Sequence, residues 1–191
     1  MSVPGAGHNG GMRQHLVLPA LAAVAALALT AAPAVAAPPT ERTIRDAAEP
    51  GKAYDILTVT MKSAVSAGRK AQVTVEHARR VRVGDGIDLW IDTDDDRQPD
   101  LYLTGYAFSE YAVYKARGWE GHGRDISDRG CASLKMRGTK SIVRVDPSCL
   151  APSTRFAISV RSFVQDRPAA SADHVPGPER LSKKVLSYQP L

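Results

Sequence analysis

Residues 86–104 read GIDLWIDTDDDRQPDLYLT, two short apolar runs on either side of an acidic loop. In the first run, Ile87, Leu89 and Ile91 alternate with Asp88, Trp90 and Asp92. A period of two is typical of a strand that buries one face. We therefore predict one strand over Gly86–Ile91 and the next over Leu101–Thr104, joined by the acidic loop.

The same alternation recurs along the chain and predicts the fold class. It marks strands at Leu57–Met61, Ala71–Val75, Tyr102–Phe108, Tyr111–Lys115, Ile142–Val145 and Phe156–Val164, with a short edge strand over Leu181–Leu186. No stretch of 12 or more residues has the 3.6-residue apolar period of an amphipathic helix. The prediction is an all-β fold, an antiparallel β-sandwich of about seven to eight short strands with one disulfide.

The N-terminal sequence predicts export. Arg13 precedes the apolar run Leu16–Ala32, and Ala34-Val35-Ala36 is a small-x-small cleavage signal. We expect residues 1–36 to be a signal peptide, residues 37–52, rich in Pro and charge, to be a flexible linker, and residues 53–191 to be a single β-sandwich domain. The expected product is secreted and extracellular, with no membrane span after signal cleavage.

The charge pattern argues against one class of partner. The chain has a net charge of +5, but its basic residues are spread along the sequence. A nucleic-acid-binding protein usually has a basic stripe interleaved with aromatic residues. We therefore predict no nucleic-acid partner.

The only two cysteines are Cys131 and Cys149. In an exported domain two cysteines most often pair, so we predict a disulfide between them. The rival interpretation is a catalytic cysteine, but no characteristic sequence surrounds either residue, and pairing removes the thiolate that catalysis needs.

The acidic loop is the candidate metal site. Asp92, Asp94, Asp96 and Asp100 occupy positions 1, 3, 5 and 9, and the Gln98 carbonyl can supply a further oxygen. This spacing lets alternate side chains turn inward on one hard cation, and calcium is the candidate cofactor. The competing interpretation is a charged hairpin turn, because Asp is a favoured turn residue.

The loop resembles calcium loops of known families. Its pattern D-x-D-x-D-x-x-P-D is similar to the loops of thrombospondin type 3 repeats and dockerins, including the Pro99-Asp100 ending. That resemblance implies calcium binding. From Tyr54-Asp55 through Gly118-Trp119 and Ser148-Cys149-Leu150 to residues 172–177, the chain also resembles a group of uncharacterised secreted β-rich proteins of high-GC Gram-positive bacteria. This second resemblance implies an extracellular β domain and no particular activity.

Aromatic residues suggest a weaker candidate site. Six of the 11 Phe, Trp and Tyr residues lie between Tyr102 and Trp119. Rings on a sheet face can stack against sugars, so Tyr106, Tyr111 and Trp119 are candidate ligand-binding residues. The competing interpretation is core packing, because aromatic residues are enriched in strands.

The common catalytic motifs are absent from the sequence, with no G-x-S-x-G elbow, H-E-x-x-H, P-loop or S-x-x-K. We therefore expect no catalytic residues and a non-catalytic extracellular or envelope-associated binding module. Its partner would be a cell-envelope component, a carbohydrate or a protein, with calcium as a candidate stabilising cofactor. The alternative is a secreted hydrolase or protease inhibitor that acts through an exposed loop, for which residues 148–152 are the candidate segment.

Overall fold

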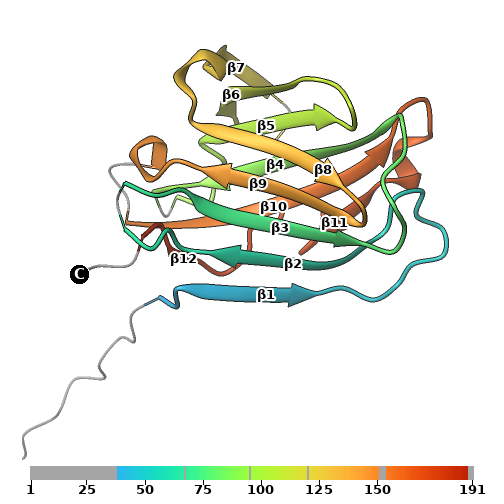
Figure 1. Ribbon diagram of the computed structural model, residues 1–191, viewed down its shortest axis with the longest axis horizontal. Helices are drawn as coiled ribbons and strands as arrows, with labels where there is room; N and C mark the ends of the chain where they lie inside the picture. The colour runs from blue at the N-terminus through green and yellow to red at the C-terminus, as the bar shows by residue number, and fades with distance from the viewer. Residues whose placement is uncertain (1–37, 67, 95, 120, 151–153, 189–191) are drawn as a thin grey trace, which may run out of the picture. The chain divides into compact units, whose positions relative to one another are not determined.

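A computed structural model of the protein describes residues 38–66, 68–94, 96–119, 121–150 and 154–188. The expected signal peptide lies outside these residues. The described residues all belong to one unit, in which the strands form two antiparallel sheets (Figure 1). The predicted all-β sandwich with one disulfide is confirmed. None of the helices in this part of the chain is long and apolar enough to cross a membrane.

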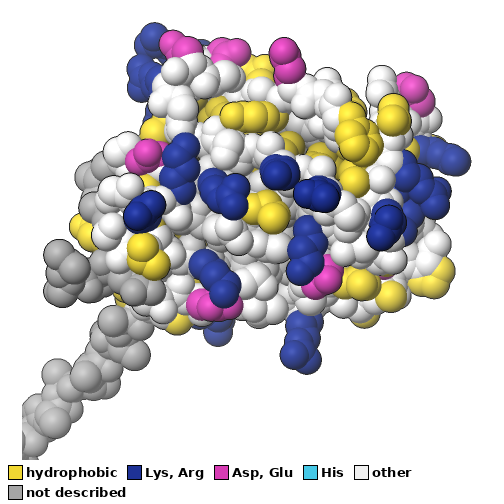
Figure 2. All heavy atoms as spheres, viewed as in Figure 1, with side chains coloured by type: hydrophobic (Ala, Val, Ile, Leu, Met, Phe, Trp, Pro, Cys, Tyr) yellow, Lys and Arg dark blue, Asp and Glu magenta, His cyan; other side chains and the backbone are white. Residues whose placement is uncertain are grey.

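The first sheet has five strands in the order β1-β2-β3-β9-β8. Their bounds are β1 Glu41–Arg45, β2 Ile56–Lys62, β3 Ala71–His77, β8 Ala132–Arg137 and β9 Lys140–Val145. The Lys and Arg side chains seen on this side of the molecule are dispersed over the surface, in keeping with the scattered charge of the sequence (Figure 2).

The second sheet has seven strands and carries the candidate sites. Its order is β11-β10-β4-β5-β6-β7, and β12 pairs with the start of β10 outside this path. The bounds are β4 Asp85–Asp92, β5 Leu101–Tyr106, β6 Tyr111–Arg117, β7 Gly121–Asp125, β10 Arg155–Val164, β11 Asp173–Val175 and β12 Val185–Leu186. Within the described ranges, three 3₁₀ turns lie between strands: η1 Ser127–Arg129, η2 Pro147–Leu150 and η3 Ala169–Ser171.

The core lies between the two sheets. Ile87, Leu89 and Ile91 of β4 belong to the same buried cluster as Val73 of β3 and Val143 of β9. Removing such side chains from water is the main force that holds two sheets together.

All eight residues of β4 are buried, whereas its alternation predicted a half-buried strand. The second face is covered because side chains of the flanking strands, Arg161 of β10 and Tyr102 of β5, contact Asp88 there, and the segment after β11 contributes to a cleft over that face.

Several strand assignments differ from the sequence expectations. The edge strand expected over Leu181–Leu186 is confined to β12, Val185–Leu186. Residues 41–45, within the expected linker, form β1, which pairs with β2 and packs Ile44 against the core. The described residues also contain more strands than the expected seven to eight: β7, GHGRD, has no apolar alternation, whereas β8, ASLKMR, alternates but is absent from the predicted strands.

The predicted disulfide joins Cys131, which precedes β8, to Cys149 in η2, with the Cα atoms 5.5 Å apart. It fastens the connection between β9 and β10 to the start of β8. Pro147 and Leu150 of η2 are buried, so this segment is a packed turn.

Candidate functional site

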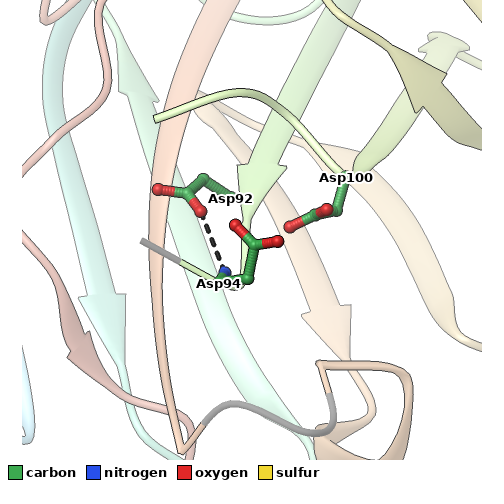
Figure 3. A group of neighbouring side chains, drawn as sticks. All are labelled: Asp92, Asp94 and Asp100. Carbon is green, nitrogen blue, oxygen red and sulfur yellow. Dashed lines mark hydrogen bonds between the residues drawn. The ribbon is translucent and has the colours of Figure 1, made fainter. Parts of the chain in front are cut away.

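The acidic loop joins the end of β4 to the start of β5. Asp92 ends β4 and is 1% exposed, and Asp100 directly precedes β5. One carboxylate oxygen from each of Asp92, Asp94 and Asp100 lies within 4.8 Å of the others. Figure 3 shows the Asp94 carboxylate between the other two. This group could hold a metal ion, because carboxylate oxygens are the ligands that hard cations prefer.

Hydrogen bonds inside the loop orient its carboxylates. An Asp92 oxygen accepts from the Asp94 N–H at 3.0 Å, and an Asp94 oxygen accepts from the Asp96 N–H at 3.1 Å. An Asp96 oxygen in turn accepts from the Gln98 N–H at 2.6 Å. This repeated bond from a side chain to the backbone two residues on is the usual role of Asp in turns.

Two further contacts offset part of the charge of the group. The Lys184 ammonium, from the segment before β12, lies 3.3 Å from an Asp92 carboxylate oxygen. An Asp100 oxygen accepts from both the Thr93 N–H at 2.7 Å and the Thr93 hydroxyl at 2.6 Å. A metal ion bound here would therefore share Asp92 with a lysine.

The structure brings together three of the predicted metal ligands. Asp96 is exposed and lies outside the group formed by Asp92, Asp94 and Asp100. Gln98 is tied to the loop through its backbone N–H, and its carbonyl remains a predicted ligand.

A second candidate site lies on the face of the seven-stranded sheet that turns away from the core. In the pairing of the strands, Trp90 of β4 lies beside Tyr102 of β5 and Ser159 of β10. Arg161 of β10 lies beside Asp88 of β4 and His174 of β11. Because alternate residues of a strand share a face, these side chains meet on one side. They help to line a cavity of about 350 Å³, here called the sheet cleft. Its lining residues are Trp90, Tyr102, Trp119, His122, Ser159, Arg161, His174, Pro178 and Glu179.

An ion pair between a buried carboxylate and a partly exposed arginine supports the floor of the sheet cleft. Asp88 is fully buried, accepts from Arg161 Nε at 2.7 Å and contacts the other end of the same guanidinium. The Tyr102 hydroxyl donates to the second Asp88 oxygen at 2.7 Å. Burial is the main cause that raises the pKa of Tyr102, and the negative charge of Asp88 raises it further. The hydroxyl therefore stays protonated and donates its hydrogen bond to Asp88.

Aromatic rings form much of the cleft wall. The Trp90 ring centroid lies 5.2 Å from that of Tyr102 and 6.0 Å from that of Trp119, and the His122 ring stacks on Tyr102 at 4.6 Å. Trp90 and Tyr102 are nearly buried, whereas Trp119 is partly exposed and His122 is exposed. Trp119 and His122 are therefore the rings that a ligand can reach most easily.

Two further polar side chains line the sheet cleft. The Ser159 hydroxyl oxygen is buried and has no hydrogen-bond partner among the described residues. A buried hydroxyl without a partner is costly, which makes it a candidate to bond a ligand. Burial, followed by the charge of Arg161, lowers the pKa of His174, which favours a neutral ring at neutral pH.

The predicted ligand-binding aromatics are placed apart from one another. Trp119 lines the sheet cleft. Tyr106 is 39% exposed and packs edge-on against Phe163, and Tyr111 is 37% exposed; neither lines this cleft.

A comparison with protein-family models, curated proteins and solved structures finds no significant match to this chain.

Proposed function

We propose that the protein is a secreted, non-catalytic binding module of the extracellular space or cell envelope, and that it binds a saccharide in the sheet cleft. The observation that carries the proposal is the combination of accessible rings with fixed polar groups on one sheet face. Trp119 and His122 offer flat apolar surfaces, while Ser159 and His174 offer hydrogen-bonding groups. A sugar presents this same pairing, with C–H faces and a rim of hydroxyls.

Binding is favoured over catalysis because the described lining of the sheet cleft holds one carboxylate, Glu179, whereas glycoside hydrolysis uses a pair, and the buried Asp88 lies beneath the floor. Asp88 is held by Arg161 and by the Tyr102 hydroxyl, so its oxygens already have partners. A general acid or base must be free to exchange a proton with a substrate. The protease-inhibitor alternative finds less support, because Leu150, in the candidate segment, is buried within a 3₁₀ turn.

The proposal includes calcium as the ion held by the acidic loop. Three carboxylates from a loop that resembles calcium loops favour this ion, and calcium tolerates irregular shells of oxygen ligands. Magnesium demands a near-ideal octahedral shell and fits such a loop less well. In this proposal the ion ties the end of β4 to the start of β5, and thereby stabilises the strands that carry Trp90 and Tyr102.

Titration of a panel of neutral and acidic oligosaccharides, followed by tryptophan fluorescence, tests saccharide binding. At least one member should bind, and Trp119→Ala should weaken it by about 2 kcal/mol, roughly thirtyfold in Kd, as is typical of a central aromatic contact. The bound oligosaccharide should be recovered at its original length after prolonged incubation.

Phe108→Ala is the matched control, because Phe108 is 74% exposed and does not line the sheet cleft. This variant should bind like the wild type. Equal affinities of wild type and Trp119→Ala for every ligand, or no binding of any oligosaccharide, would count against a saccharide site in this cleft.

A further inference from the structure

A second cavity, of about 790 Å³, adjoins the sheet cleft. Trp119 and Glu179 line both cavities, so the two form neighbouring parts of one surface. The second cavity is bounded by the end of β4, the acidic loop, the start of β10 and the segment from Pro176 to Lys184. We call it the cationic cleft.

The side chains that line the cationic cleft are strongly biased to one sign. Among the residues that the structure describes, its basic side chains are Arg97, Arg155, Arg180, Lys183 and Lys184, and its acidic ones are Asp92 and Glu179. Lys184 and Asp92 form an ion pair with each other. With that pair and Arg155, which has interactions of its own, set aside, the lining cations Arg97, Arg180 and Lys183 outnumber Glu179 by three to one. A cavity lined by one sign of charge focuses the field and attracts ligands of the opposite sign.

Arg97 is a notable member of this set because of its backbone. It lies at position 6 of the acidic loop, where related calcium loops carry glycine, and its φ is +65°. A residue with a side chain is unfavourable in this left-handed region, where glycine is not. The chain nevertheless carries a long cation here, and its side chain lines the cationic cleft.

We propose that the cationic cleft binds the acidic groups, carboxylate or phosphate, of an anionic saccharide chain whose sugar ring contacts Trp119. The inference rests on the proposed saccharide function and names its ligand class. Arginine is suited to either acid, because its planar guanidinium can donate two parallel hydrogen bonds to carboxylate or phosphate oxygens. A single chain can reach both cavities, because Trp119 belongs to both linings.

The test compares probes that differ in charge. Oligogalacturonate supplies carboxylates on sugar rings, its full methyl ester is the uncharged counterpart, a phosphorylated oligosaccharide supplies phosphates on sugar rings, and a short single-stranded DNA is a polyanion without pyranose rings. We expect one acidic polymer to bind at least tenfold more tightly than the ester. The acidic polymer that binds more tightly shows whether the cleft prefers carboxylate or phosphate. Trp119→Ala should lower the affinity for that polymer at least tenfold.

The double variant R97Q/R180Q removes two cations of the cleft. It should lower the affinity for the acidic polymer at least tenfold. Its control, R137Q/R144Q, removes two exposed arginines from β8 and β9 in the other sheet, and should change that affinity less than twofold. Thermal melts of both double variants verify that each is folded.

Several outcomes would overturn the inference. Equal binding of oligogalacturonate and its ester, with Trp119→Ala weakening both, would refute the anionic class and leave the saccharide function standing. Equal losses of affinity in R97Q/R180Q and R137Q/R144Q would show that binding depends on the net charge of the protein and not on this cleft. Binding of the DNA as tight as that of the polymers, unaffected by Trp119→Ala, would indicate a general polyanion surface and refute both proposals.

Discussion

At the scale of single residues, the buried polar groups of the sandwich depend on specific partners. His77, at the end of β3, is 2% exposed, stacks on Tyr54 at 3.8 Å and shares a hydrogen bond of 2.9 Å with the Ser141 hydroxyl. Arg79 covers the Tyr54 ring, with its guanidinium carbon 4.7 Å from the centroid. Burial is the main reason that the pKa of His77 falls to about 4.

This pKa predicts that acid destabilises the protein. In the unfolded chain histidine takes up a proton near pH 6.5, whereas folded His77 takes it up only near pH 4. The unfolded state therefore binds more protons between these values, and stability falls as the pH falls through this window. From pH 7.5 to pH 4 the contribution is about 3 kcal/mol of unfolding free energy. Urea unfolding at several pH values measures it.

The His77→Gln variant is the reference for that measurement. Its unfolding free energy should fall less between pH 7.5 and pH 4, because the contributions of the carboxylates are common to both proteins. Parallel pH profiles for the wild type and His77→Gln would contradict a buried neutral histidine.

At the scale of elements, the acidic loop concentrates charge where two strands end. Asp92 and Asp100 lie at the facing ends of β4 and β5, and Asp94 lies between them (Figure 3). Carboxylates this close repel one another unless cations compensate, and Lys184 pairs with Asp92. The folded loop should therefore gain stability from a further cation.

Calcium should accordingly raise the melting temperature. At about 100 times its Kd, an ion that binds only the folded state stabilises by about 2.7 kcal/mol, a shift of several degrees for a domain of this size. Asp94→Asn should abolish the response, whereas Asp96→Asn should retain it, because Asp96 lies outside the group. Magnesium should have a smaller effect. Identical melting temperatures of the wild type in calcium and in chelator would show that the loop is a charged turn that binds no calcium.

The sequence predicted the elements better than the site they build. The β4–acidic loop–β5 unit was predictable because alternation and turn residues act over a few positions. The sheet cleft was not, because it depends on β10 pairing with β4: Asp88 and Arg161 are 73 positions apart. Asp88 and Trp90 look like solvent-facing positions of a strand until that pairing places Arg161 and Ser159 beside them. Trp119 was predicted only as one aromatic residue among several.

At the scale of the whole molecule, the disulfide and the expected signal peptide make a joint covalent prediction. The secreted protein should begin near Ala37 and carry the Cys131–Cys149 bridge. Intact mass before and after reduction, with thiol alkylation, measures both. Reduction should cost about 3 kcal/mol of unfolding free energy in the chain-entropy model. Two alkylated thiols in the unreduced secreted protein, or a mass that retains residues 1–36, would contradict the prediction.

The position of β10 has a consequence for how the chain is made. This strand is the longest described, begins only at Arg155, and is paired with β4, β11 and β12. A ribosome or an export channel delivers the chain from its N-terminus, so β4 emerges long before the neighbour that covers its open edge. Until then that edge exposes unpaired backbone groups next to a buried apolar face, the combination that promotes aggregation. We therefore expect chains truncated before β10 to aggregate more readily than the full-length chain.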